Sequence, residues 1–353
     1  MAEYFEVFDS SFEGAGIVDV YDELVWERRF YEAGYFELHA PATKNNIELL
    51  KTNQILYKNG STENGLITAV ESSEGDGTAS IVAYGRFLSW LLKKHIIKSD
   101  MVLSGNAEEI MRQLVYDTVM NPETDDYIAE LRLGDKCGAL AQVDGFAGYE
   151  DLHDALSNIA KQTGVGFRVR FDPENKLLYF ECVEGIDRSI EQTANPQVVF
   201  SAEYDNILSQ ANQMINTTPE VNAVTVRYSG EYGELEVYHN PTGASGRNKK
   251  EVILTDNPVT YIDSEGVVRM NVPATRSKFL QKAKNAIKAI SDEFRCVAST
   301  GGYKKEYELG DVVTVFKPEW GVTKNMRLEK VTENTTGAGF EIIPVFGEPF
   351  PAE

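Results

Sequence analysis

Cysteine and histidine are scarce in this chain of 353 residues, which has three cysteines and four histidines. Cys137, Cys182 and Cys296 are odd in number and far apart, which excludes a disulfide framework, and no Cys-x-x-Cys spacing indicates zinc. The histidines lack the spacing of a metal-binding pair. They are His39, His95, His153 and His239. We therefore expect no metal and no other cofactor, and assembly in a reducing cytoplasm.

Basic residues are in the minority. The chain has 34 Lys and Arg against 55 Asp and Glu, which gives a formal net charge of −21. Phosphate contacts need clustered positive charge, so this composition argues against DNA or RNA as a bound partner. No apolar run approaches the roughly 18 residues that cross a bilayer, and Met1–Glu6 lacks the features of a secretory signal. We expect no membrane insertion by this chain.

Catalytic motifs are missing as well. The sequence has neither the Gly-x-Ser-x-Gly turn of many hydrolases nor a phosphate-binding loop. Carboxylate pairs such as Asp125 and Asp126 arise easily among 55 acidic residues. A glycosidase needs two carboxylates held at a defined distance across a cleft, which no pair here indicates. We predict no catalytic residues and no enzymatic activity.

The apolar content is sufficient for two to four folding units, since 42% of the residues are hydrophobic. Residues 4–95 predict short strands separated by turns. Two of these turns, at Lys58–Ser61 and Glu74–Gly77, place glycine where positive φ is needed. Several strands at this spacing are typical of a barrel or a sandwich.

Helical periodicity follows these strands. Asn106 begins a capping-box pattern ahead of apolar residues spaced at i, i+3, i+4 and i+7. A second amphipathic helix is predicted over 150–163, with Gly164 as its C-cap, and a hairpin follows with its turn at Asp172–Asn175. Residues 96–195 therefore predict a compact α+β unit.

A third helix is predicted over Thr275–Asp292, and one of its faces is basic. The basic residues on that face are Arg276, Lys278, Lys282, Lys284 and Lys288. Such a stripe is either a solvated helix surface or a docking face for an acidic neighbour, such as another copy of the same chain.

A weak internal repeat connects the two ends of the chain. Its two series of strand-like segments are 54–57, 66–71 and 81–85, and 311–315, 327–332 and 342–347. Val70 precedes Gly85 by 15 positions, and Val331 precedes Gly347 by 16. The repeat predicts two β units built on one plan, although alternating strands also resemble each other by chance.

Aromatic residues and arginines gather between Trp26 and Leu38. Aromatic residues favour a pleated, half-buried surface, so this segment predicts paired strands. Trp, Tyr and Arg also anchor protein–protein contacts. Trp26, Arg28, Arg29 and Tyr31 therefore indicate either an interface or a strand with one buried face.

The same segment is part of a longer pattern. Residues 26–38 read Trp-x-Arg-Arg-Phe-Tyr-x-x-Gly-x-Phe-Glu-Leu, followed by Gly-Arg-Phe-Leu at 85–88 and Phe-Gly-Glu at 346–348. Over nearly the whole chain this pattern resembles the tail-hub family of long-tailed phages and prophages. That family is similar to the baseplate hub of contractile phages and to the N-terminal part of tail-associated lysins.

The resemblance implies an α+β fold that is mainly β: two related antiparallel β-barrels with two inserted α+β domains, in a ring-forming homotrimer. The expected ranges are 1–95 for the first barrel, 96–195 for the first insert, 196–231 and 299–348 for the second barrel, 232–298 for the second insert with the basic helix, and 349–353 for a tail.

The function implied by the resemblance is structural, at the distal tail tip or baseplate of a virion that is assembled in the host cytoplasm. The trimer would be a hub that closes the tail tube and joins the sixfold tube to a threefold tip. It would provide a channel for the tape-measure protein and for DNA, which passes in transit without being bound. Its partners would be its own copies, the distal tail protein or tube ring, the tape-measure protein and a tip or receptor-binding protein.

Subunit contacts are expected at the residues singled out above. These are Trp26, Arg28, Arg29, Tyr31, Lys282, Lys284 and Lys288. Two other functions remain open: a cell-wall-degrading hydrolase and a module that binds host-surface carbohydrate. The sequence ends shortly after the last barrel motif, so we expect any wall-cutting activity to belong to another chain.

Overall fold

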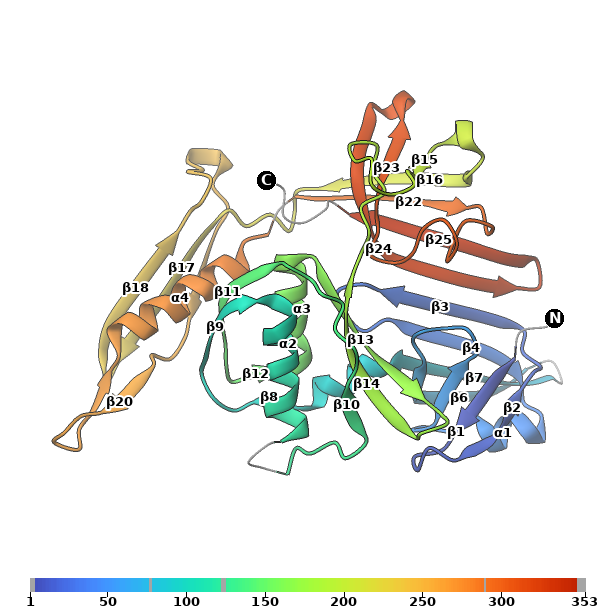
Figure 1. Ribbon diagram of the computed structural model, residues 1–353, viewed down its shortest axis with the longest axis horizontal. Helices are drawn as coiled ribbons and strands as arrows, with labels where there is room; N and C mark the ends of the chain where they lie inside the picture. The colour runs from blue at the N-terminus through green and yellow to red at the C-terminus, as the bar shows by residue number, and fades with distance from the viewer. Residues whose placement is uncertain (1–3, 76–77, 122–124, 289, 348–353) are drawn as a thin grey trace.

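The computed structural model describes residues 4–75, 78–121, 125–288 and 290–347. Over these ranges the protein is mainly β, and most neighbouring strands are antiparallel. Figure 1 shows a large sheet, a central unit with two helices, and a second unit at the far end of the molecule. No described helix is long and apolar enough to span a membrane. The turn at Asp76–Gly77 and the tail 349–353 lie outside the described residues.

The large sheet has thirteen strands, and eleven of them follow a single path. In spatial order these are β16 (Ile207–Asn216), β22 (Ser291–Ala298), β25 (Gly339–Gly347), β24 (Val322–Thr336), β3 (Glu23–Arg29), β4 (Tyr35–Pro41), β7 (Thr78–Phe87), β6 (Gly65–Gly75), β5 (Ile55–Lys58), β1 (Phe5–Phe8) and β2 (Gly14–Val18). The remaining two are β23 (Val312–Lys317), which pairs with β24, and β15 (Val199–Phe200), which pairs with β23.

This sheet corrects the expectation of two separate closed barrels. Over the described residues no strand pairing closes either part, and the two parts instead share one continuous ladder. The physical reason is the length of β24, which has 15 residues. Its first part pairs with β23, and its second part pairs with β3 from the other end of the chain.

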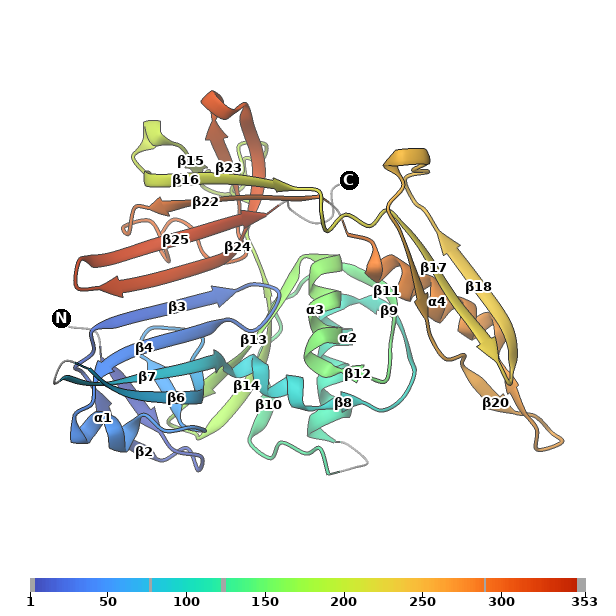
Figure 2. The same ribbon diagram turned by 180° about the vertical axis from the view of Figure 1, so that it is seen from behind.

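The internal repeat is visible in the strand order. The path β3–β4–β7–β6–β5, here called the first half, has the same antiparallel order as β16–β22–β25–β24–β23, the second half. Both halves contain a three-stranded meander, β5–β6–β7 and β23–β24–β25, as the sequence repeat predicts. Figure 2 shows the two halves stacked one above the other, with β3 and β24 between them.

A β-bulge occupies the same place in both halves. The register between β6 and β7 shifts at Thr68, and that between β24 and β25 shifts at Glu329, 261 positions later (329 minus 68). Gly85 lies opposite Ile67 and Phe346 lies opposite Leu328, again 261 positions apart in each case (346 minus 85, 328 minus 67). Bulges are specific features of a strand pair, so their matching positions support the internal repeat. They shift the alignment of the two halves by one residue from the alignment that pairs Gly85 with Gly347.

The first insert follows the first half. Its elements are the short helix η1 (Leu88–Lys94), β8 (Ile96–Ile97), β9 (Met101–Asn106), α2 (Ala107–Val115), the π-helix η2 (Tyr116–Met120), β10 (Leu131–Leu133), β11 (Gln142–Ala147), β12 (Glu150–Asp151), α3 (Leu152–Thr163), β13 (Val165–Asp172) and β14 (Leu177–Glu184). As predicted, the Asn106 side chain caps α2, Gly164 ends α3 with φ of 72°, and the Asp172 turn joins β13 to β14.

The second insert occupies the loop between β16 and β22, at the position where residues 30–34 join β3 to β4 in the first half. Its elements are β17 (Ala223–Gly230), β18 (Gly233–His239), η4 (Gly246–Asn248), β19 (Glu251–Thr255), β20 (Thr260–Ile262), β21 (Val268–Met270) and α4 (Val272–Ala286). Three short helices complete the fold: α1 (Lys44–Leu49), η3 (Ala202–Tyr204) and η5 (Pro318–Trp320).

The strand pairing places the ends of the second insert differently from the ranges expected from the sequence. β17 was expected in the second barrel, but it pairs with β18 and β19 and packs against α4. Residues 291–298 were expected in the insert, but they form β22 of the large sheet. The helix predicted to reach Asp292 ends at Ala286, because Ile287 already has the extended backbone (ψ 130°) that leads into β22.

Candidate functional site at the junction of the two halves

The two halves meet where β3 pairs with β24. The antiparallel register runs from Arg29 opposite Lys330 to Leu24 opposite Thr335. Phe30 continues the contact, since its N–H donates to the Glu329 carbonyl at 2.9 Å. The segment that the sequence marks as aromatic and basic therefore forms the boundary between the halves.

Trp26 lies in the core of the first half. Its side chain is 0% exposed, and its ring centroid lies 4.8 Å from Phe87, 5.5 Å from Phe36 and 5.9 Å from Phe5. An aromatic residue of this size buries about 150–250 Å². Trp26 therefore stabilises the fold of the chain, which corrects the expectation that it forms a surface contact with another subunit.

Arg28 is buried at the junction and holds both halves. Its Nε donates to Glu63 at 2.7 Å and its Nη2 to the Thr62 hydroxyl at 2.9 Å, both in the first half. Its Nη1 donates to the Tyr303 hydroxyl at 2.7 Å and to Glu308 at 2.9 Å, just before β23. Burial opposes the charge, but Tyr303, Glu63 and Glu308 outweigh it and raise the pKa of Arg28 above its usual range. Arg28 is thus an internal contact, not a surface one.

A second buried ion cluster lies beside it. Lys58 on β5 donates to Glu333 on β24 at 2.6 Å, and Lys304 donates to the other oxygen of Glu333 at 2.8 Å. Burial alone would raise the pKa of Glu333, but Lys58 and Lys304 lower it below its ordinary value. Sequence reasoning missed this cluster and the acidic partners of Arg28, because the paired residues lie up to 280 positions apart.

Arg29 and Tyr31 lie at the edge of the junction. Arg29 is half-buried and pairs with Glu27 at 2.6 Å and Glu32 at 2.7 Å. Tyr31 is buried, which raises its pKa to about 12. Of the four residues expected here at an interface, only Arg29 retains substantial exposure, because Trp26 and Arg28 lie on the buried face of β3 and Arg29 lies on its half-buried face.

Phe30 connects the junction to the first insert. A Cβ added at Gly166 on β13 would lie 2.6 Å from the Phe30 ring, and one added at Gly310 would lie 2.2 Å from it. Gly310 also has φ of +96°, which favours glycine. Both halves and the first insert therefore meet around one aromatic side chain.

The basic face of α4 divides into a buried part and an exposed part. Lys278 is buried, with its Nζ 3.5 Å from Asp100 of the first insert and 3.7 Å from Asp256, and Lys282 pairs with Asp256 at 3.0 Å. A cleft of about 800 Å³ opens beside them between the two inserts. Lys284 and Lys288 are exposed, and Lys288 lies beyond the end of the helix. The acidic neighbour of this face is thus partly the first insert of the same chain.

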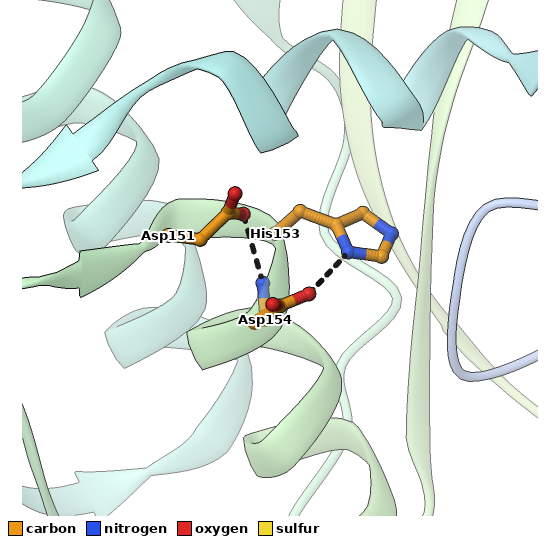
Figure 3. Close-up of side chains that lie close together, drawn as sticks. All are labelled: Asp151, His153 and Asp154. Atoms are coloured by element: carbon orange, nitrogen blue, oxygen red, sulfur yellow. Dashed lines mark hydrogen bonds and ion pairs between the residues drawn. The ribbon is translucent and has the colours of Figure 1, made fainter.

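Asp151, His153 and Asp154 form a cluster of possible metal ligands at the start of α3 (Figure 3). Their hydrogen bonds explain the cluster without an ion. The Ala33 N–H donates to His153 Nε2 at 3.0 Å, so Nδ1 carries the proton and donates to Asp154 at 3.3 Å. Burial lowers the pKa of His153. Asp151 caps the helix by accepting from the Asp154 N–H. The cluster joins α3 to the turn between β3 and β4.

Comparison with known proteins decides the family. Residues 4–348 match the family described as siphovirus ReqiPepy6 Gp37-like protein. The chain belongs to this family of siphovirus tail proteins. The resemblance expected from the sequence is thereby confirmed at the level of a phage tail protein family. A search of curated proteins found no match.

Solved structures of tail proteins share the fold. The tail protein from Neisseria meningitidis MC58 is 14% identical with a TM-score of 0.57, and the match covers 99% of this chain and 97% of that one. The 43 kDa tail protein of prophage MuSo2 from Shewanella oneidensis is 14% identical with a TM-score of 0.54, covering 98% of each chain. Prophage tail protein gp18 from Listeria monocytogenes EGD-e is 11% identical with a TM-score of 0.51, covering 98% and 94%.

Proposed function

We propose that this tail protein is a trimeric hub that closes the distal end of the tail tube. The observation that carries the proposal is the repeated half, because one chain holds two five-stranded halves side by side through β3 and β24. Three copies supply six such halves. A threefold assembly of repeated halves matches a sixfold tube ring on one side and a threefold tip on the other.

The placement of the inserts supports this role. The second insert occupies a hairpin loop of the second half, so it extends the molecule without interrupting the sheet (Figure 1). The halves then form the wall of the ring, and the inserts present separate surfaces to neighbouring tail components. The partners proposed here are the distal tail protein or tube ring, the tape-measure protein, and a tip or receptor-binding protein.

Charge supports a channel. A trimer of chains that each carry −21 has a formal net charge of −63. Clustered cations bind phosphates, whereas an acidic wall lets DNA slide past without being held. The proposed hub therefore passes the tape-measure protein and then DNA, and the chain itself catalyses nothing.

Mass measurement and imaging test the proposal. Light scattering should give three times 39.4 kDa for the purified chain, and labelled particles should show it at the distal end of the tail tube. A label along the tube shaft or on the head would contradict the hub. Turnover of purified peptidoglycan would favour the hydrolase alternative, and binding of host glycans by the chain alone would favour the carbohydrate-binding alternative.

A further inference from the structure

Among the strand edges of the large sheet that have no backbone partner over the described residues are one edge of β16 and part of one edge of β6. β16 is the last strand on its side and pairs only with β22. β6 pairs with β5 only through Gly65 and Leu66, so the same edge is open along 69–75, whose opposite edge pairs with β7. An open edge presents unpaired N–H and C=O groups to any strand that fits it.

The junction inside the chain shows a strand that fits such an edge. In the repeat, β24 is the counterpart of β6, and β3 is the counterpart of β16. β24 pairs with β23 through its first part, and β3 fills the rest of the same edge. β3 therefore lies beside β24 at the position that is open beside β6. Because β16 is the counterpart of β3, β16 of another copy fits that open position.

The repeat also gives the register. In the junction, Glu333 lies opposite Trp26. Ser72 holds the position of Glu333, 261 positions earlier (333 minus 72), in agreement with the two bulges. Gln213 holds the position of Trp26, because each lies opposite a phenylalanine of the adjoining strand. The equivalent contact places Ser72 opposite Gln213.

The side chains along these edges suit each other in that register. Ile215 is 62% exposed and Met214 is 50% exposed. Two residues further along each strand, Ile215 lies opposite Val70, which is half-buried. Cross-strand pairs of β-branched residues stabilise a sheet, and this contact would remove the side chains of Ile215 and Val70 from water.

We propose that neighbouring copies of this chain join through β6 of one copy and β16 of the next, antiparallel, with Ser72 opposite Gln213. The two edges lie on opposite sides of the molecule (Figure 1), so the contact is head-to-tail and repeats from copy to copy. Each contact between copies then has the same strand geometry as the junction within a copy. This inference rests on the proposed function, because it names the strands through which the hub closes.

Disulfide trapping tests the contact. In a Cys137→Ser background, which removes the exposed native thiol, one preparation carries Ser72→Cys and another carries Gln213→Cys. A disulfide requires Cα atoms within about 7 Å, which directly opposed strand residues satisfy. Oxidation of the mixture should give a covalent dimer that a reductant dissolves. Each preparation alone should give no covalent dimer. In a head-to-tail contact a residue of one copy does not lie opposite the same residue of the next copy.

A shifted pair is the matched control. Asn216 lies three residues along β16 from Gln213, about 10 Å away, so Asn216→Cys mixed with Ser72→Cys should give at least tenfold less dimer. Equal trapping by both pairs, or none by the matched pair, would overturn the proposed register.

A charge placed in the contact gives a second measurement. Ile215→Asp should weaken self-association at least tenfold in Kd by light scattering. Leu208→Asp should leave it unchanged, because Leu208 is 60% exposed on the same strand but outside the register. A trimer that lacks the matched cross-link would overturn the strand contact and leave the hub proposal standing. A matched cross-link in a chain whose assembly has another mass would support the contact and count against the trimer.

Discussion

At the scale of single residues, Arg28 shows how a charge is kept inside a protein. Its guanidinium is 3% exposed and donates to four oxygens from both halves of the sheet. A buried ion pair is expensive to form, and removing one partner leaves the other without compensation. The four oxygens around Arg28 therefore offset the cost of burying its charge at the junction.

Arg28→Met should destabilise the folded chain by about 3–5 kcal/mol, because Glu63 is left buried without its cation. Adding Glu63→Gln to this variant should recover part of the loss. Arg29→Met is the matched control, since its ion pairs are half-exposed and the cost should stay within about 1 kcal/mol. Urea unfolding of the four proteins gives these values, and equal losses for Arg28→Met and Arg29→Met would contradict the buried network.

Glu329 is a residue whose environment disfavours its charge. Burial raises its pKa from 4.5 to about 7, with Glu293 acting in the same direction against Lys330 and Arg327. Because the folded pKa exceeds the unfolded one, the protonated form stabilises the fold below about pH 4.5. That contribution falls as the pH rises through about 7.

Glu329→Gln should therefore stabilise the chain at pH 8 by up to about 3 kcal/mol, and have little effect at pH 4. The measurement is the difference in unfolding free energy between variant and parent at both pH values. Glu341→Gln, an exposed position on β25, is the control. A stabilisation that does not change with pH would show that the carboxylate charge is not its source.

At the scale of elements, the second insert has its own core. Phe279 of α4 is 0% exposed and packs with Val224, Val226, Val237 and Ala283. These residues belong to α4, β17 and β18 and none belongs to the large sheet. The insert therefore gains most of its stability locally.

Phe279→Ala should cost the insert about 3–5 kcal/mol and unfold it locally. Amide hydrogen exchange should accelerate in β17, β18 and β19, while β3 and β24 keep their protection. Phe340→Ala, at a residue 44% exposed on β25, is the control and should change neither region. Loss of protection across the large sheet would mean that insert and sheet unfold as one unit.

At the scale of the whole molecule, the fold is a repeated sheet with an insert placed in one hairpin. The loop from 217 to 290 lies where residues 30–34 turn the chain in the first half. Removing such an insert leaves the strand ladder intact, since β16 and β22 already pair with each other.

Replacing residues 217–290 by a short turn should thus give a chain that folds and associates to the same number of copies as the intact protein. The contacts of Lys278 with Asp100, and of Asn285 with Gln162, are lost, so a modest drop in thermal stability is expected. Light scattering and circular dichroism check the result. An unfolded product would show that the insert is required for the sheet to form.

Local features were readable from the sequence because neighbours along the chain determine them. The cap at Asn106, the C-cap at Gly164 and the Asp172 turn all depend on hydrogen bonds within a few residues. The phage tail family followed from the pattern that starts at Trp26. The repeat was visible too, since strands that bury one face on the same plan keep a similar alternation.

Only the tertiary structure decided what the strands pair with. The sequence holds no signal that β24 pairs with β3, that Glu308 reaches Arg28, or that Lys58 reaches Glu333, because each of these partners is 275 or more positions away. On exposed strands the attraction between these paired charges would be weak, because water solvates them. Burial at the junction strengthens that attraction, and burial is a property of the folded sheet, not of any segment of the chain.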